Sequence, residues 1–287
     1  MLRGLRRPKA FYIDMRVLVT GSSGHLGEAL IRTLSNSGHE VIGLDILESP
    51  FTACVGSITD RACVRHCLAG VQTVLHSATL HKPHVATHSR QDFIDTNVTG
   101  TLNLLEEAVT AGVASFVYTS TTSVFGDALV PPPGAPAAWV TEELTPIPRN
   151  IYGVTKAAAE DLCQLFHRNQ RLGCIVLRTS RFFPEEDDNE TAREAYADEN
   201  LEVNEYLFRR VDLEDVVSAH LLAASRAPTI GFRKIHHQRN DALFAGRSSR
   251  LVDRCPYRRA TPCSGLRNRV CSSRLENDSK RRPRVRQ

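Results

Sequence analysis

The sequence predicts an α/β protein with a doubly wound parallel β-sheet. From Met15 to about residue 230, short apolar runs alternate with amphipathic segments of helical period, as in folds where a crossover helix follows each strand. A glycine-rich turn joins the first apolar run to the first amphipathic segment. The chain has 287 residues, 41% of them hydrophobic, which is enough for one large domain and a smaller lobe.

The first half of the chain supplies the expected elements in order. Arg16–Thr20 is an apolar run that ends in a glycine turn, and Leu26–Asn36 places leucine and alanine at helical spacing before the helix-ending Gly38. A long amphipathic helix is expected over Asp92–Ala111. Three further short runs predict strands: Glu40–Asp45, Val71–His76 and Ser115–Ser120.

The second half continues the alternation. A proline-rich surface loop, Pro131–Gly134, precedes a helix expected over Asn150–Arg168. Cys174–Arg178 is apolar on both faces, as a buried parallel strand should be, and Asp212–Ala224 predicts one more helix. We therefore expect four parts, with these boundaries: an N-terminal extension at 1–14, the main domain at 15–180, a small lobe at 181–232 and a tail at 233–287.

The charge distribution changes abruptly near Phe232. Residues 233–287 carry 14 Arg and 2 Lys against 4 acidic residues, a net charge of +12, and since the whole chain carries +4, residues 1–232 carry −8. The basic segment has neither strand nor helix periodicity, which fits a disordered tail or the product of a lost reading frame. Nucleic-acid binding is less favoured, because only Phe244 and Tyr257 are aromatic there.

The composition excludes several classes of protein. No apolar stretch reaches the roughly 18 residues needed to cross a bilayer, so no membrane partner is expected. Met1–Asp14 has four basic side chains but no apolar core like that of a secretory signal. We interpret it as a dispensable extension before Met15, and an organellar transit peptide is the alternative.

The eight cysteines show no C-x-x-C pair and no histidine at metal-ligand spacing, which predicts reduced thiols, a cytoplasmic location and no metal.

The glycine-rich turn reads Gly21-Ser22-Ser23-Gly24-His25-Leu26-Gly27. Its first glycine lets the chain leave the strand sharply, the second lets backbone approach a pyrophosphate, and the third lets the helix pack closely on the sheet. The unpaired N–H groups and the positive dipole end of the following helix would face the phosphates. A strand before the turn and a helix after it favour a dinucleotide-binding loop over a simple turn.

Asp45 ends the second expected strand, 18 residues after Gly27. A carboxylate at this interval accepts hydrogen bonds from the ribose hydroxyls of the adenosine half and repels a 2′-phosphate. NAD is therefore expected as the cofactor rather than NADP. The alternative is that Asp45 only caps the next turn.

Tyr152 and Lys156 are four residues apart in the helix expected over Asn150–Arg168, so a phenol and an ammonium lie on the same helical face. Together with a dinucleotide loop 125 residues earlier, this pair is typical of enzymes that move a proton and a hydride at a C–OH/C=O centre. Either motif alone is weak evidence.

The chain resembles the extended short-chain dehydrogenases/reductases, and within them the NAD-dependent epimerase/dehydratase family that includes UDP-glucose 4-epimerase. Five ordered motifs carry the resemblance: the glycine-rich turn, Leu75-His76-Ser77-Ala78, Asn97-Val98-Thr99-Gly100-Thr101, Thr119–Gly126 and the pair Tyr152 and Lys156. The resemblance covers about residues 15–232. It implies a Rossmann-type NAD-binding domain at 15–180 and a small, truncated substrate-binding lobe at 181–232.

The resemblance implies a role for each matched residue. Tyr152 would be the general acid or base at the substrate hydroxyl, and Lys156 would favour the ionised form of that tyrosine and hold the nicotinamide ribose. Thr121 would donate a hydrogen bond to the reacting oxygen, and Asn97 would be a structural and relay residue that contacts the cofactor. The other implied cofactor contacts are the seven residues of the glycine-rich turn, Asp45, Ser57, Ile58, Ser77 and Ala78.

Three positions depart from the family pattern. Ser57 replaces an acidic residue that often contacts the adenine amine. Thr122 and Ser123 follow Thr121 where dehydratases have Asp-Glu, which argues against dehydration. Arg181 stands where sugar-nucleotide enzymes usually have Asn near the substrate, and a guanidinium suits a carboxylate or phosphate. The alternative for Arg181 is a surface ion pair with the acidic residues that follow it.

The sequence therefore predicts an NAD-dependent epimerase or related oxidoreductase that acts on a hydroxyl- or carbonyl-bearing carbon of a sugar-type or nucleotide-sugar substrate. The competing hypothesis is a non-catalytic NAD-binding protein with an incomplete substrate lobe. The family resemblance also implies a homodimer, formed through the helices expected over Asp92–Ala111 and Asn150–Arg168.

A thermal melt with NAD, with NADP and with neither tests the role expected of Asp45. NAD at about 100 times its dissociation constant should add roughly 2.7 kcal/mol to the free energy of unfolding. NADP at the same concentration should raise the melting temperature less, and this preference should shrink in Asp45→Asn. Equal shifts with the two cofactors would contradict the expectation.

Overall fold

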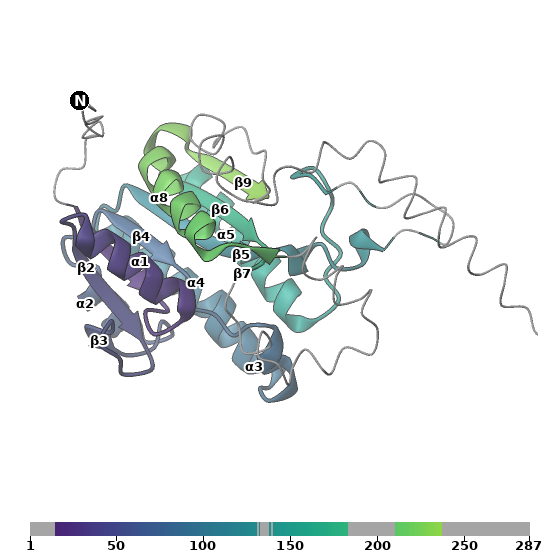
Figure 1. Cartoon of the computed structure of the whole chain (residues 1–287), viewed down its shortest axis with the longest axis horizontal. Coiled ribbons are helices and arrows are strands. Elements are labelled where there is room, and N and C mark those ends of the chain that lie inside the picture. The colour runs from purple at the N-terminus through teal and green to yellow at the C-terminus, as the bar shows by residue number, and fades with distance from the viewer. Residues whose placement is uncertain (1–14, 131, 133–137, 139, 183–209, 237–287) are drawn as a thin grey trace, which may run out of the picture. The chain divides into compact units, whose positions relative to one another are not determined.

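The computed structural model describes residues 15–130, 132, 138, 140–182 and 210–236. All of them lie within residues 1–238, the first of the two units into which the chain divides. Within this unit seven parallel strands form one sheet in the order β3-β2-β1-β4-β5-β6-β9 (Figure 1). Their bounds are β1 Arg16–Thr20, β2 Glu40–Asp45, β3 Cys54–Val55, β4 Thr73–His76, β5 Ser115–Thr121, β6 Gly173–Thr179 and β9 Phe232–His236.

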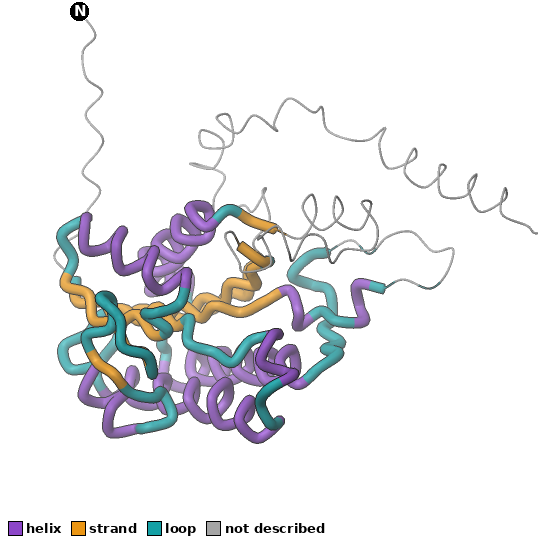
Figure 2. The backbone as a smooth tube through the Cα atoms, turned by 60° about the horizontal axis from the view of Figure 1, so that its bottom comes forward, coloured by secondary structure: helices purple, strands orange, loops and turns teal. Residues whose placement is uncertain are grey.

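Helices cover both faces of the sheet, as Figure 2 shows. On one face α1, His25–Asn36, packs against α8, Leu213–Ile230. On the other face α4 lies between α2 and α5, and a π-helical turn joins it to the short α3. The bounds of these elements are α2 Arg61–Cys67, α3 Arg90–Phe93, the π-turn Ile94–Thr99, α4 Gly100–Thr110 and α5 Ile151–Gln170. The predicted fold class, a doubly wound parallel sheet of Rossmann type, is confirmed.

Smaller elements surround the carboxyl ends of the strands. Three 3₁₀ turns span Lys82–Ala86, Thr122–Val124 and Asp127–Leu129. A separate two-stranded parallel sheet pairs β7, Arg181–Phe182, with β8, Arg210–Val211. Residues 183–209, about half of the predicted small lobe, lie outside the described residues, as do the N-terminal extension and nearly all of the predicted tail.

The elements differ from the sequence expectations at three places. The long helix expected over Asp92–Ala111 is divided by the π-turn. The sequence analysis gave no bounds for β3 and α2, because a two-residue strand and a seven-residue helix are too short to show a period. Strand β9 crosses the predicted boundary at residue 232 and pairs with β6, so the sheet extends to His236. The basic residues of β9 hid its strand pattern in the sequence.

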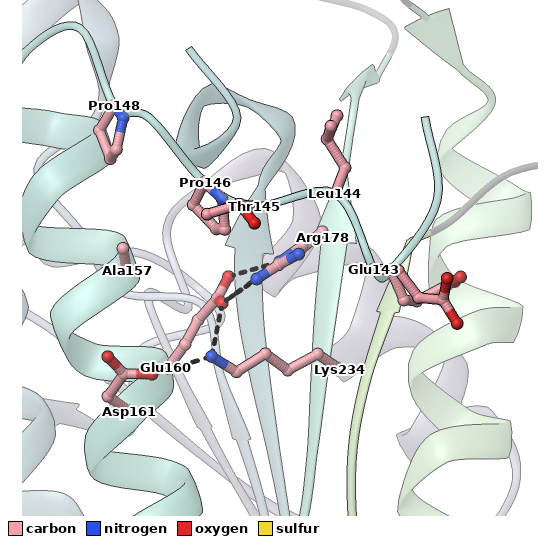
Figure 3. A pocket seen from close by; sticks show the side chains of 11 residues that line it. Glu143, Leu144, Thr145, Pro146, Pro148, Ala157, Glu160, Asp161, Arg178 and Lys234 are labelled. Carbon is pink, nitrogen blue, oxygen red and sulfur yellow. Dashed lines mark hydrogen bonds and ion pairs between the residues drawn. The ribbon is translucent and has the colours of Figure 1, made fainter. Parts of the chain in front are cut away.

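A buried ion pair joins α5 to the sheet. Both oxygens of Glu160 accept hydrogen bonds from the Arg178 guanidinium on β6, the shortest at 2.7 Å, and the two side chains are 0% and 2% exposed. The Ser120 hydroxyl on β5 donates to Glu160 at 2.6 Å. The Lys234 ammonium on β9 lies 3.4 Å from the same carboxylate (Figure 3). One carboxylate therefore ties the helix to three adjacent strands.

We expect Glu160→Ala to lower the free energy of unfolding by about 3–5 kcal/mol, because it leaves the Arg178 guanidinium buried without its counter-charge. Asp161→Ala is the matched control. The Asp161 side chain is 72% exposed and pairs only with Lys234 among its described ion pairs, so its loss should cost about 1 kcal/mol or less. Chemical denaturation of the two variants measures the difference, and equal losses would contradict the importance assigned to the pair.

Candidate cofactor and catalytic site

The sequence-predicted residues gather at the carboxyl ends of the central strands. Strand order reverses between β1 and β4: the chain runs from β1 outward to β2 and β3, and then returns to the other side of β1. In open α/β sheets ligands bind in the crevice at such a switch point. The glycine-rich turn follows β1, and Ser77 and Ala78 follow β4, so both border this crevice.

The glycine-rich turn has no room for side chains where it meets its neighbours. Gly21 has a φ of +74°, and a Cβ there would lie 2.7 Å from the Ala78 nitrogen. A Cβ on Gly27 would lie 2.0 Å from the Gly21 carbonyl oxygen. Gly24, by contrast, is exposed, and a Cβ there would meet only the Gly21 carbonyl oxygen, at 3.2 Å. The first and third glycines therefore close the turn, and the second leaves its outer side open.

The start of α1 fits a pyrophosphate. Its N-cap is Gly24, which makes no side-chain cap hydrogen bond. Since the first N–H groups of a helix have no intrahelical acceptor, the N–H groups that follow Gly24 keep their capacity for an anion. Gly24 and His25 are exposed, whereas the Leu26 side chain is buried in the core, so Leu26 can offer a ligand only its backbone. These residues fit the phosphates of NAD.

Asp45 and two hydroxyl side chains hold the turn in this shape. The Asp45 carboxylate accepts hydrogen bonds from the backbone nitrogens of Ser23 and Leu47, both at 3.0 Å. The buried Ser22 hydroxyl bonds to Thr52 at 2.9 Å, and the Ser23 hydroxyl contacts the same threonine at 2.9 Å. A carboxylate has about four acceptor positions, so two backbone contacts leave Asp45 able to accept from ribose hydroxyls.

Tyr152 and Thr121 come from adjacent elements. Tyr152 lies in the first turn of α5 and is 8% exposed. A Cβ on Gly153 would lie 2.7 Å from the Ser123 carbonyl oxygen, so this turn packs directly against the 3₁₀ turn that follows Thr121. The Thr121 hydroxyl oxygen accepts from the Ser123 nitrogen at 3.1 Å, which fixes the side chain and leaves its O–H hydrogen to donate.

Lys156 is buried one turn further along α5, at 1% exposure. Its ammonium donates to the Thr119 carbonyl at 2.6 Å and lies 4.1 Å from the centre of the Tyr118 ring. Burial lowers the pKa of Lys156 to about 7, while the Glu160 carboxylate acts in the opposite direction. The side chain therefore changes charge near neutral pH, where a proton-transfer site needs it.

Asn97 sits in the π-turn, buried, and its side chain joins two segments. It donates to the Leu80 carbonyl at 2.9 Å and to the Thr155 hydroxyl at 3.0 Å, and it accepts from the Leu80 nitrogen and the Thr79 hydroxyl. These four contacts use the full capacity of the amide. They support the structural part of the expected role and leave no donor or acceptor for a relay.

The other residues expected to contact the cofactor differ in which of their groups can face a ligand. The Ser77 hydroxyl donates to the Thr20 carbonyl at 2.7 Å, and Ala78 packs against Gly21. Ser57 accepts from the Thr59 nitrogen at 3.1 Å and keeps partial exposure. Ile58 is 5% exposed in the core, so only its backbone can face a ligand. The Arg181 backbone forms β7, and its side chain lies outside what the structure describes.

The sequence analysis missed three contributors to the site. Thr52 braces the glycine-rich turn, and no motif marks it. His76 is buried between the hydroxyls of Thr20 and Thr101, at 2.7 and 3.0 Å, and burial, then the Lys156 ammonium, lowers its pKa well below the usual value. The His81 ring contacts the His84 ring, at 4.4 Å between centroids, and burial, then His84 and Lys156, lower the pKa of His81.

A cavity of about 450 Å³ lies beside this site, between α5, β6, β9 and the segment before α5 (Figure 3). Its charged lining residues are Glu142, Glu143, Glu160, Asp161, Arg178 and Lys234. Figure 3 shows the Arg178 and Lys234 side chains converging on Glu160 at its base. Lys234 was assigned to the tail by the sequence analysis, but the structure makes it part of the sheet and of this cavity wall.

The sequence model of the NAD dependent epimerase/dehydratase family matches residues 17–230. The chain belongs to this family. Its membership confirms the resemblance drawn from the five motifs, and it confirms NAD as the cofactor class at the level of the family.

Curated relatives of this epimerase/dehydratase-family protein include a steroid dehydrogenase and a sugar-nucleotide epimerase. The 3-beta-hydroxysteroid dehydrogenase of Mycolicibacterium neoaurum is 40% identical over 119 residues, which are 38% of this chain and 32% of the relative. The UDP-glucose 4-epimerase of Erwinia amylovora is 30% identical over 184 residues, 57% of this chain and 52% of the relative. The chain thus spans about a third to a half of the length of these relatives.

Solved structures of family members share the fold. MoeE5, in complex with UDP-glucose and NAD, superposes with a TM-score of 0.63 and 26% identity over 83% of this chain and 82% of its own. UDP-glucose 4-epimerase of Thermotoga maritima, with UDP-glucose, gives a TM-score of 0.58 and 26% identity over 73% of each chain. Among the described residues, no helix is both long enough and apolar enough to cross a membrane.

The buried Lys156 makes stability depend on pH in a defined direction. Between pH about 7 and about 10.5 the unfolded chain holds a proton on Lys156 that the folded chain has lost, so the free energy of unfolding should rise with pH across this window. Lys156→Met should flatten that rise and be more stable than the parent at pH 7, by a few kcal/mol at most. Denaturation at several pH values measures both, and an unchanged pH profile would contradict the assignment.

Proposed function

We propose that this protein is an NAD-dependent oxidoreductase or epimerase that acts at a secondary alcohol carbon, with Tyr152, Lys156 and Thr121 as its catalytic residues. The observation that carries the proposal is the packing of the first turn of α5 against the turn after Thr121, with the buried Lys156 ammonium beneath. A phenol, an ammonium and a hydroxyl donor then border one place at the carboxyl end of β5.

Each residue has a chemical task in this proposal. Tyr152 takes the proton of the substrate hydroxyl as a general base, and returns it as a general acid in the reverse step. Thr121 donates its remaining O–H hydrogen to the substrate oxygen. Lys156 has one of its three N–H groups on the Thr119 carbonyl, so two are left for the Tyr152 oxygen or a ribose hydroxyl. NAD, when bound, supplies hydride acceptance and return at the carbon.

NAD fits the residues at the other end of the crevice. The open outer side of Gly24 and the start of α1 would hold the pyrophosphate, and Asp45 would accept from the adenosine ribose while repelling the 2′-phosphate of NADP. Ser57 would border the adenine end of NAD, and Ser77 would border the path toward its nicotinamide end.

The substrate proposed first is a nucleotide sugar. Among the relatives, the names include UDP-glucose 4-epimerase, and two of the structural neighbours contain UDP-glucose. A hydroxysteroid dehydrogenase is also among the relatives, and it shares the same alcohol chemistry. Arg181, at the position where a substrate contact is expected, suits the phosphates of a nucleotide sugar better than an uncharged sterol.

The proposal also includes a cytoplasmic location, an N-terminal extension over residues 1–14 and a homodimer. The exposed Val154 and Leu165 lie 11 residues apart on α5, three helical turns, and so share one face that a second copy could cover.

Tyr152→Phe tests the catalytic proposal. Without the phenol hydroxyl, turnover should fall by about 10²- to 10⁴-fold, while the NAD dissociation constant stays within about threefold. Thr121→Ala should also lose turnover, and its neighbour Thr122→Ala is the matched control that should keep it. The assay follows NADH absorbance and sugar epimer formation on UDP-glucose and UDP-galactose, with a hydroxysteroid as the comparison substrate.

The outcomes separate the hypotheses. Turnover that survives in Tyr152→Phe would remove this residue from the mechanism. An unmodified protein that binds NAD but turns over no alcohol in the panel would favour the non-catalytic NAD-binding protein. Net NADH formation would exclude a pure epimerase.

A further inference from the structure

Three cysteines that are distant in sequence meet at the β3 edge of the sheet. Cys54 lies on β3, and Cys63 and Cys67 lie on α2, which Figure 1 places beside β3. Their sulfur atoms all lie within 4.8 Å of one another, and those of Cys54 and Cys63 are 3.6 Å apart. Within the described part of the chain, no other group of three potential metal-binding side chains converges in this way.

The local backbone is arranged around these sulfurs. Cys63 and Cys67 are four residues apart, so both face the same side of α2, toward Cys54. Gly56 lies directly over the cluster, and a Cβ there would come within 2.4 Å of the Cys63 sulfur. Tetrahedral zinc–thiolate coordination, with Zn–S of about 2.3 Å, needs sulfurs about 3.8 Å apart. The Cys54–Cys63 separation of 3.6 Å is close to this value, and all three sulfurs lie within 4.8 Å of one another.

The exposure of the three sulfurs leaves an entry path. Cys67 is 2% exposed in the core, whereas Cys54 and Cys63 are partly exposed. A bound ion would therefore have three protein ligands on the inner side and a position open toward solvent.

The thiols are poorly suited to redox chemistry at neutral pH. Burial, together with the neighbouring thiols, raises the pKa of Cys67 well above its usual value, and burial raises the pKa of Cys63 as well. Because the thiolate is the nucleophile in disulfide chemistry, protonated thiols react slowly with oxidants. A soft metal ion can instead displace these protons as it binds.

We propose that Cys54, Cys63 and Cys67 bind one soft divalent metal ion, Zn²⁺, through three sulfur ligands, with water in the fourth position. Three thiols and Zn²⁺ form an anionic tris-thiolate complex and release three protons, so no oxidant or reductant is needed. Thiolate ligands select zinc and other soft ions over Mg²⁺ and Ca²⁺. The ion would fix the connection from β3 to α2, which contains Ser57 and Ile58, and the site itself does not depend on the proposed catalytic function.

The test is a titration of the full chain with Cd²⁺, a spectroscopic substitute for Zn²⁺, followed by competition with Zn²⁺. It uses protein kept reduced with a phosphine, and the readouts are the ultraviolet thiolate-to-metal charge-transfer band and proton release. Three more cysteines, Cys255, Cys263 and Cys271, lie outside the described residues, so the parent for the titration carries serine at all three.

Variants then assign the ligands. We expect one ion per chain in the parent, and affinity more than about tenfold weaker in Cys54→Ser and in Cys63→Ser, since even changes outside the ligand sphere cost 10- to 100-fold. Cys174→Ala, at a buried cysteine outside the cluster, is the matched control and should keep full affinity. Cys54 lies on a short edge strand, so its variant should keep a cooperative melt even where a core substitution does not.

Two results would overturn the proposal. One is a parent that melts cooperatively but shows no charge-transfer band with Cd²⁺. The other is binding that survives unchanged in the folded Cys54→Ser variant.

Discussion

The buried carboxylate of Glu160 is the constraint on which the catalytic half of the structure depends. It binds the Arg178 guanidinium, the Ser120 hydroxyl and the Lys234 ammonium, and thereby fixes the rotation and height of α5 over β5, β6 and β9. Tyr152 and Lys156 are carried by the same helix, so their positions follow from this contact. A buried charge is costly unless it is paired and hydrogen-bonded. Here Glu160 pairs with the buried Arg178, and the partly exposed Lys234 is shared between Glu160 and Asp161. The Lys156 ammonium obtains its own compensation from the Thr119 carbonyl and the Tyr118 ring.

The part of the structure around the glycine-rich turn depends on close backbone packing and not on a buried ion pair. Gly21 and Gly27 allow the turn after β1 to fold onto itself and onto Ala78, and Asp45 holds the turn by accepting from the Ser23 nitrogen. The carboxylate proposed to accept from the ribose therefore also shapes the glycine-rich turn. His76 ties the end of β1 to α4, because its buried ring bonds to Thr20 and to Thr101.

Much of this could be predicted from the sequence, since each successful inference rested on a local pattern. The bounds of β1 and β2 follow from apolar runs bounded by glycine, and the site residues from spacing on a strand end or a helix face. The rest depends on tertiary contacts. The hydrogen bonds of Asn97, the contact of Thr52 with the glycine-rich turn and the ion pair of Glu160 all join residues that are 17 or more positions apart in the sequence. The thiol cluster forms only because the chain turns back between β3 and α2 and brings Cys63 next to Cys54, nine residues earlier. Strand β9 was missed because the pairing with β6, and not its own basic residues, makes it a strand.

The order of the sheet also bears on how the chain avoids association with itself. Among the described strands, the two edges are β3 and β9, and an open edge is a template on which other chains can add strands. β3 has only two residues, which is too short to pair stably with a foreign strand. β9 carries the exposed Arg233, and a positive charge on this edge repels a second copy of the same edge. The features that made these strands hard to recognise in the sequence are thus the ones that protect the sheet from edge-to-edge aggregation.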